Sequence, residues 1–222
     1  MFTSPFSSKK QILTPDSELV FVADMFASEY AGGAELTSQA LIDSCPLKID
    51  MVHSRDVNID VLEAGHEKFW VFGNFSQMDM ELIPTIVANM DYAVLEYDYK
   101  FCKYRSPEKH QFIESRPCNC SNEMQGKLIS TFYHGSKSLW FMSEKQMQNY
   151  KEKFPTLDNC TVLSSVFDDD FFFTIKNLNK ENAKKERKGW IVLGSSSWIK
   201  GAADAENWCK DNDLDYEVVW GL

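Results

Sequence analysis

The stretch from Glu18 to Leu41, ELVFVADMFASEYAGGAELTSQAL, combines an apolar strand, a short loop and the start of an amphipathic helix. The strand is expected over Leu19–Ala23 and the helix over Ala34–Ser44, and the loop ends in Gly32-Gly33-Ala34-Glu35. Glycines at a helix start leave backbone N–H groups accessible, and the helix dipole adds partial positive charge there. The stretch is either a simple strand-to-helix turn or a site for a phosphate or polar ligand. Its position after the first strand of an α/β pattern favours binding.

The chain beyond this stretch continues to alternate short apolar runs with helical patterns. Runs that are apolar on both faces are typical of buried parallel strands, so the alternation predicts an α/β fold with a doubly wound, mostly parallel, Rossmann-like sheet. The further strands are expected over Leu47–His53, Phe69–Phe72, Tyr92–Glu96, Leu139–Met142 and Thr161–Ser164, and the further helices over Asp79–Asn89 and Glu144–Phe154. In contrast, the stretch Tyr97–Asn122 is rich in cysteine, proline and charge and shows no clear period.

A polar, lysine-rich segment over residues 176–188 divides the chain and is expected to be a linker or an exposed helix. After it the pattern restarts with a strand over Trp190–Leu193, a helix over Ala202–Asp211 and a strand over Tyr216–Trp220. We therefore expect a first Rossmann-like domain over residues 1–175 and the start of a second over residues 189–222. Two strands and one helix bury little core, so these pieces either extend the first sheet or begin a domain that continues. We expect the second, with the chain as the front part of a longer protein.

The composition argues against several classes of function. A formal net charge of −10 argues against non-specific nucleic-acid binding, which depends on Lys and Arg at phosphates. The sequence has no apolar run of about 18 residues, so no transmembrane segment is expected. The polar residues 1–18 lack the apolar core of a secretory signal. Six cysteines without an export signal favour a reducing, cytoplasmic location, where metal binding outranks disulfides.

The irregular stretch contains a candidate metal site with the spacing C-x7-H-x7-C-x-C, formed by Cys102, His110, Cys118 and Cys120. Three thiolates and one imidazole suit tetrahedral zinc, and a loop of this length needs a cross-link to be ordered. A closed set of four ligands predicts a structural zinc ion. Because the spacing differs from the usual C-x2-C knuckle, unrelated free cysteines and a strained Cys118–Cys120 disulfide stay open as alternatives.

The order of strand, Gly-Gly-Ala-Glu loop and helix resembles the N-terminal domain of GT-B-type glycosyltransferases, in particular the retaining group called family 4. Thr161–Asp168 stands where that family has a strand and a turn before the interdomain linker. Gly189–Gly194, followed by Trp198-Ile199-Lys200-Gly201, is similar to the opening of the family's donor-binding domain. The resemblance spans the whole chain in order, although the matched motifs are short.

The resemblance implies two Rossmann-like domains facing each other across a cleft, a nucleotide-sugar donor, and a saccharide or other hydroxyl acceptor. Transfer would retain the sugar's configuration and need no bound metal for the chemistry. Gly32, Gly33, Ala34 and Glu35 would face the donor. Lys200, beside Gly201, would neutralise its diphosphate.

Acidic residues at strand ends are the acceptor-side candidates, because ligands of open α/β sheets bind at the carboxyl edge. Asp24, Glu96 and Asp98 could each accept a hydrogen bond from an acceptor hydroxyl, or could be solvated charges. The sequence identifies no catalytic residue. Gly194 stands where the family commonly has a basic residue, and the family's donor-site glutamates have no counterpart before Leu222. A non-catalytic sugar- or nucleotide-binding module with a zinc-ordered loop is therefore the alternative.

Overall fold

The computed structural model describes residues 13–186 and 188–220, apart from the side chain of Ile199. The chain divides into two compact units, Met1–Asp168 and Asp169–Leu222, which we describe separately. Residues 1–12 lie outside the described residues. They make up most of the N-terminal stretch in which we expect no secretory signal. Among the residues that are described, no helix combines the length and the apolar character needed to cross a membrane.

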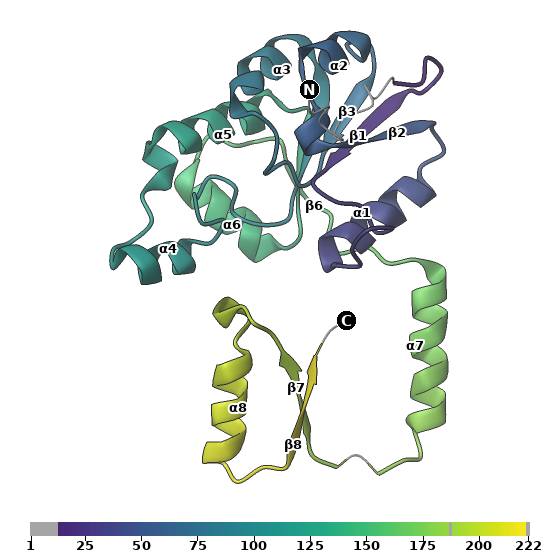
Figure 1. The fold of residues 1–222 in the computed structure, drawn as a ribbon, viewed down its shortest axis with the longest axis vertical. Helices are drawn as coiled ribbons and strands as arrows, with labels where there is room; N and C mark the ends of the chain where they lie inside the picture. Colours follow the sequence, from purple (N-terminus) through teal and green to yellow (C-terminus); the bar gives the residue numbers. More distant parts are fainter. Residues whose placement is uncertain (1–12, 187, 221–222) are drawn as a thin grey trace, which may run out of the picture. The chain divides into compact units, whose positions relative to one another are not determined.

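The first unit is built on a six-stranded, all-parallel sheet with the order β2-β1-β3-β4-β5-β6 (Figure 1). Its strands are β1 (Leu19–Ala23), β2 (Ile49–His53), β3 (Phe69–Phe72), β4 (Asp91–Glu96), β5 (Ser138–Phe141) and β6 (Cys160–Val162). The predicted Rossmann-like α/β fold class is confirmed. Because β2 and β3 lie on opposite sides of β1, the topological switch point falls between β1 and β3. The last strand is shorter than expected, since Ser164 has a left-handed φ of 67°.

Six helices connect these strands: α1 (Gly33–Ser44), α2 (Ile59–Ala64), α3 (Ile83–Asn89), α4 (Pro107–Glu114), α5 (Met124–Gly135) and α6 (Glu144–Lys153). Short 3-10 turns are η1 (Ser54–Asp56), η2 (Met80–Leu82) and η3 (Cys120–Asn122). The single helix expected over Asp79–Asn89 is divided into η2 and α3. Helices α2, α4 and α5 were not expected.

The stretch Tyr97–Asn122 is not irregular throughout, because it contains α4 and η3. Helix α4 begins where the Ser106 hydroxyl accepts a hydrogen bond from the Lys109 N–H and Pro107 occupies the first turn, both of which are strong helix-start signals. The helix shows no apolar period, because its only buried residue is His110. The His110 side chain contacts Cys102 and Cys120. A hydrophobic pattern alone therefore misses it.

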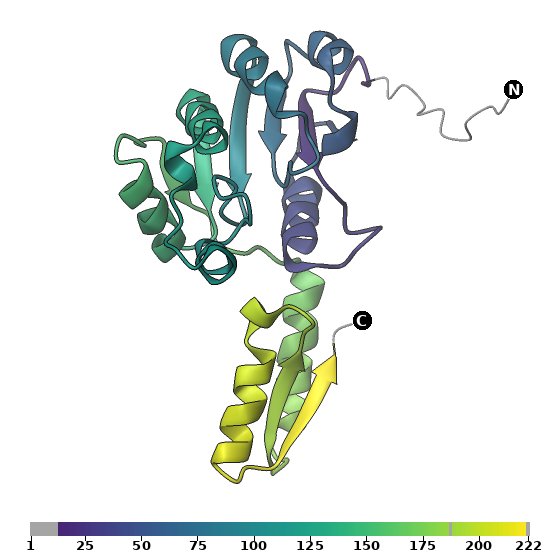
Figure 2. The same ribbon diagram turned by 60° about the vertical axis from the view of Figure 1, so that its left-hand side comes forward.

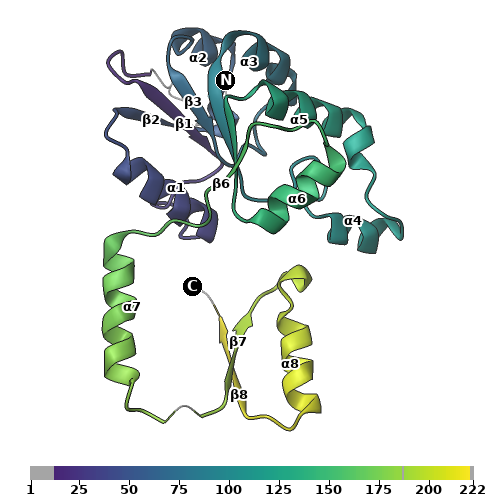
Figure 3. The ribbon, with the colours of Figure 1, turned by 180° about the vertical axis from the view of Figure 1, so that it is seen from behind.

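Both faces of the sheet are buried against helices, as the apolar strands predict. On one face, Trp70, Phe72 and Tyr92 pack with residues of α2, α3, α5 and α6. Phe132 of α5 stacks on Tyr92 at 4.8 Å between ring centroids. On the other face, Leu19, Phe21, Val71 and Leu95 pack with Leu41 and Ile42 of α1. Figure 3 shows these layers from behind.

The second unit contains α7 (Asp169–Asn182), β7 (Trp190–Gly194), η4 (Trp198–Lys200), α8 (Ala202–Asp211) and β8 (Tyr216–Trp220). Strands β7 and β8 pair in parallel, and α8 packs beside them (Figure 2). The Trp190 and Trp208 rings lie 5.2 Å apart, and Val192 and Cys209 are buried. Helix α7 occupies the first part of the segment expected to be a linker or an exposed helix.

Candidate metal centre and polar cluster at the carboxyl edge

The four predicted metal ligands lie together in the described structure. The ligand atoms of Cys102, His110, Cys118 and Cys120 all lie within 4.8 Å of one another. His110 Nδ1 lies 3.8 Å from the Cys102 sulfur and 3.3 Å from the Cys120 sulfur. All six cysteines of the chain are free, so the alternative of a Cys118–Cys120 disulfide is wrong.

The geometry and chemistry of this cluster fit a metal ion. At a Zn–S distance of about 2.3 Å, two thiolates of a tetrahedral site lie roughly 3.8 Å apart, which is within the 4.8 Å that encloses all four ligand atoms here. Cys102, His110 and Cys120 are buried, and Cys118 is half-buried. Burial raises the pKa of the Cys102 thiol, and it raises the pKa of Cys118 to about 12. A metal ion would therefore bind by displacing thiol protons.

A glycine allows the metal cluster to pack closely on α5. A Cβ at Gly126 would lie 2.1 Å from the carbonyl oxygen of Cys120, the first residue of η3. Any larger residue at this position would push η3, and with it the Cys120 ligand, away from α5. The cluster thus joins the loop after β4, helix α4 and the start of α5.

Asp24 is the centre of a hydrogen-bonded network at the switch point. Its carboxylate accepts hydrogen bonds from the Ser54 and Ser76 hydroxyls, each at 2.5 Å, and from the Gln77 N–H at 3.3 Å. Burial alone would raise the pKa of Asp24, but these hydrogen bonds outweigh burial and lower it. Asp24 follows β1, Ser54 follows β2, and Ser76 and Gln77 follow β3, so this one carboxylate ties three strand ends together.

Glu96, the last residue of β4, forms a buried ion pair. Its side chain is fully buried, and its Oε1 accepts hydrogen bonds from Lys100 Nζ at 2.9 Å and from the Asp98 N–H at 2.8 Å. Burial raises the pKa of Glu96 to about 7 in spite of the nearby Lys100. Asp98 differs from Glu96 and Asp24 because 30% of its side chain is exposed.

Arg105 links Asp24 and Asp98, two of the three acidic residues that the sequence singled out. Its guanidinium contacts Asp98 Oδ2 at 2.5 Å, Asn74 Oδ1 at 2.9 Å and Asp24 Oδ2 at 3.7 Å. Arg105 has a left-handed φ of 55°, an unfavourable conformation for a residue with a Cβ. The sequence analysis missed both Arg105 and Lys100. The spacing of Lys100 four residues after Glu96 is the one local signal, and Arg105 has none.

The Gly-Gly-Ala-Glu loop lies at the same edge of the sheet. Gly32 is the N-cap of α1 and Gly33 its first residue. A Cβ at Gly32 would lie 2.3 Å from a Glu35 carboxylate oxygen, whereas a Cβ at Gly33 would meet no atom within 4 Å. Further along α1, the Ser38 and Tyr97 hydroxyls form a hydrogen bond of 2.7 Å, which anchors the helix beside the end of β4.

Lys200 and Gly201 belong to the second unit. Lys200 ends η4 and is exposed, and Gly201 has a left-handed φ of 72° at the start of α8. That conformation favours glycine, which accounts for Gly201 by local geometry. A donor-binding role for these two residues stays a prediction.

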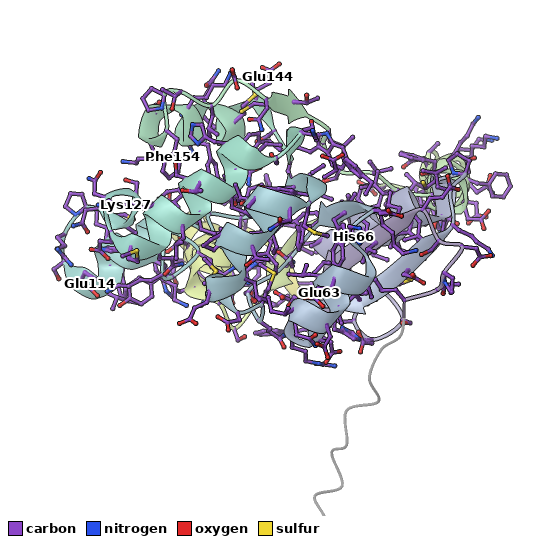
Figure 4. The ribbon with its side chains drawn as sticks, turned by 90° about the horizontal axis from the view of Figure 1, so that it is seen from above. Glu63, His66, Glu114, Lys127, Glu144 and Phe154 are labelled. Atoms are coloured by element: carbon purple, nitrogen blue, oxygen red, sulfur yellow. The ribbon has the colours of Figure 1, made fainter. Side chains whose placement is uncertain are left out.

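A cavity of about 270 Å³ lies beside the polar cluster, lined by Phe75, Ser76, Met80, Lys100, Lys103, Arg105, Gln125 and Ile129. Two larger cavities lie elsewhere. One, of about 510 Å³, is lined by residues of α2 and α3 and by His66. Glu63 and His66 are labelled in Figure 4. The other, of about 710 Å³, is lined by residues that precede β1, β2 and β3. Because ligands of open α/β sheets bind at the carboxyl ends of the strands, the smallest of the three is the best candidate site.

The raised pKa of Glu96 predicts a pH-dependent stability. Between about pH 4.5 and pH 7 the folded protein holds a proton that the unfolded chain releases, so the free energy of unfolding falls as pH rises through this window. The fall should be on the order of 3 kcal/mol. The variant Glu96→Gln should lose this contribution, measured by urea denaturation at several pH values. The exposed control Glu63→Gln should keep it, and equal pH slopes in both variants would contradict the assignment.

Comparison with known proteins adds no relative to this description. No family model matches the sequence, and no curated protein matches it. The functional argument therefore depends on the fold, the Cys–His cluster and the polar cluster at the carboxyl edge.

Proposed function

We propose that the protein is a GT-B-type glycosyltransferase that moves a sugar from a nucleotide-sugar to a hydroxyl acceptor. In this reaction the bond between the anomeric carbon and the diphosphate oxygen breaks. The anomeric carbon bonds to the acceptor oxygen, and the hydroxyl proton leaves with the diphosphate. The observation that carries the proposal is the convergence of the Gly-Gly-Ala-Glu helix start with Asp24, Glu96 and Asp98 at one edge of a parallel sheet.

The contacts within the cluster suggest separate roles for the three carboxylates. Asp24 and Glu96 are buried and already hydrogen-bonded, so in the proposal they position other groups. Asp98 is the more exposed carboxylate, and we assign it the contact with the acceptor hydroxyl. Gly32 and Gly33 would offer backbone N–H groups to the donor, and Lys200 would stabilise the charge on the leaving diphosphate.

A release assay tests the proposal. The chain is incubated with a panel of nucleotide-sugars and saccharide acceptors, and free nucleoside diphosphate is measured. We expect Lys200→Ala to reduce release roughly 100-fold, the loss typical of removing one charge-stabilising group. The control Lys210→Ala removes an exposed lysine of the same unit and should not change release. Equal rates of release in Lys200→Ala and Lys210→Ala would refute the transferase proposal.

A non-catalytic binding module is the second candidate function. The observation that favours it is the Cys–His cluster, because four protein ligands would hold an ion in the loop and leave it no open position for chemistry. We propose that the bound ion is zinc, in a structural role. Binding of a nucleotide-sugar without release of diphosphate would support the module over the transferase.

A further inference from the structure

We propose that the cavity beside the metal centre binds a small oxyanion, the phosphate or carboxylate group of a small molecule, and that metal binding assembles this site. The cavity has three basic side chains in its wall: Lys100, Lys103 and Arg105. No acidic side chain of the described residues lines it. The residues that line the cavity are thus basic, although the chain has a formal net charge of −10.

Carboxylates outside the cavity wall hold the three cations in place. Lys100 pairs with Glu96 at 2.9 Å, and Arg105 pairs with Asp98 at 2.5 Å. Lys103 pairs at 2.8 Å with Glu114, which is labelled at the end of α4 in Figure 4. These contacts fix the charged heads before a ligand arrives, which reduces the entropy lost on binding.

The cations retain hydrogen-bond donors for a ligand. Lysine has three N–H donors and arginine has five, more than the contacts above use. Arg105 Nε is buried and has no hydrogen-bond partner among the described residues. The hydroxyl of Ser76 is not available, because it donates to Asp24. The Gln125 amide donates one N–H to the Lys100 carbonyl at 3.0 Å and keeps its second. Most spare donors therefore belong to the charged residues, which suits an anion more than a neutral sugar.

The apolar part of the wall strengthens this preference. Phe75, Met80 and Ile129 line the same cavity, and Lys100 Nζ lies 5.1 Å from the centre of the Phe75 ring. Partial removal of water lowers the local dielectric constant, so a charge-assisted hydrogen bond is stronger here than on an open surface. The volume of about 270 Å³ limits the ligand to a small molecule.

The metal centre controls the loop that supplies these cations. Lys100, Lys103 and Arg105 all lie within three residues of the ligand Cys102. The Cys102 carbonyl accepts a hydrogen bond of 2.8 Å from the Arg105 N–H, and this turn holds Arg105 in its left-handed conformation. On the other wall, Gln125 lies next to Gly126, where η3 and its ligand Cys120 pack on α5. A metal ion that joins Cys102 to Cys120 therefore joins the two walls of the cavity.

The test is a titration of the full, zinc-loaded chain with inorganic phosphate at constant ionic strength, followed by ¹⁵N NMR. We expect shifts of the Arg105 and Gln125 side-chain resonances. The variant Lys103→Gln should weaken binding roughly tenfold while keeping its zinc, which is measured separately. The control Lys137→Gln also removes one lysine that pairs with a carboxylate, Asp91 at 3.0 Å, but it lies outside the cavity. Its affinity should equal that of the unchanged chain.

Parallel titrations separate the possible outcomes. Acetate binding more tightly than phosphate would identify a carboxylate as the natural group at the same site. The inference rests on the proposed metal centre, so zinc content is measured first. Zinc binding without any phosphate shift, or equal phosphate affinity in Lys103→Gln, overturns the oxyanion site and leaves the metal centre intact. Equal phosphate affinity after removal of zinc by a chelator overturns the coupling.

Discussion

Removal of the proposed zinc ion from the Cys102–Cys120 centre is expected to lower the free energy of unfolding by about 4 kcal/mol or more. An ion that binds only the folded state stabilises it by about 4 kcal/mol when its free concentration is 1,000 times its dissociation constant. Structural zinc sites bind more tightly than this requires. The loss should be centred on the stretch after β4, because all four ligands lie between Cys102 and Cys120.

Metal content and thermal unfolding measured on the same samples check this result. We expect about one zinc ion per chain, a lower melting temperature after chelation, and recovery on adding zinc back. The variant Cys120→Ser should behave like the chelated protein. The control Cys45→Ser removes a half-buried cysteine outside the cluster and should keep both zinc and stability. If the chain binds no zinc, or if its melting temperature does not change with zinc, the proposed metal centre is wrong.

Replacing Asp24 with alanine is expected to cost about 3 kcal/mol of stability or more. The carboxylate accepts hydrogen bonds from Ser54, Ser76 and Gln77 and lies 3.7 Å from Arg105. Its removal leaves buried donors and part of a charge without a partner, which costs more than the net worth of the contacts themselves. The ends of β1, β2 and β3 would then lose their common acceptor.

Urea denaturation of Asp24→Ala tests this expectation. Ser54→Ala and Ser76→Ala each remove one donor and should cost about 1 kcal/mol. The matched control is Asp91→Ala, because Asp91 is 68% exposed and pairs with Lys137 on the surface. That variant should change stability by less than about 1 kcal/mol. Equal losses in the two aspartate variants would show that Asp24 is not a network centre.

The fold class was predictable because it depends on local patterns. Strands such as Leu19–Ala23 are apolar at every position, and this indicates a parallel sheet buried on both faces. The helix expected over Glu144–Phe154 is also present, as α6, and it begins where the Ser143 hydroxyl accepts a hydrogen bond from the Gln146 N–H. Helix α4 was missed, although Ser106 and Pro107 mark its start, because its buried face turns toward the Cys–His cluster and carries no apolar period.

The candidate site was predictable only in its residue types. Cysteine and histidine have few roles when clustered, so Cys102, His110, Cys118 and Cys120 could be selected before their positions in space were known. The partners of Asp24 could not be selected in this way, because serine and arginine are common and their roles depend on their neighbours. The same limit applies to the buried state of Glu96, which sets its raised pKa.

The amino-acid sequence alone therefore specifies an alternating α/β chain and a set of candidate metal ligands, because strand, helix and ligand chemistry depend on side chains close together in the chain. The strand order and the switch point between β1 and β3 become visible only in the folded chain. The contact between Arg105 and Asp24 and the cavity lined by three cations also become visible only in the folded chain. The reason is physical: each of these depends on contacts between segments that are distant in sequence, and the packing of the whole sheet selects those contacts.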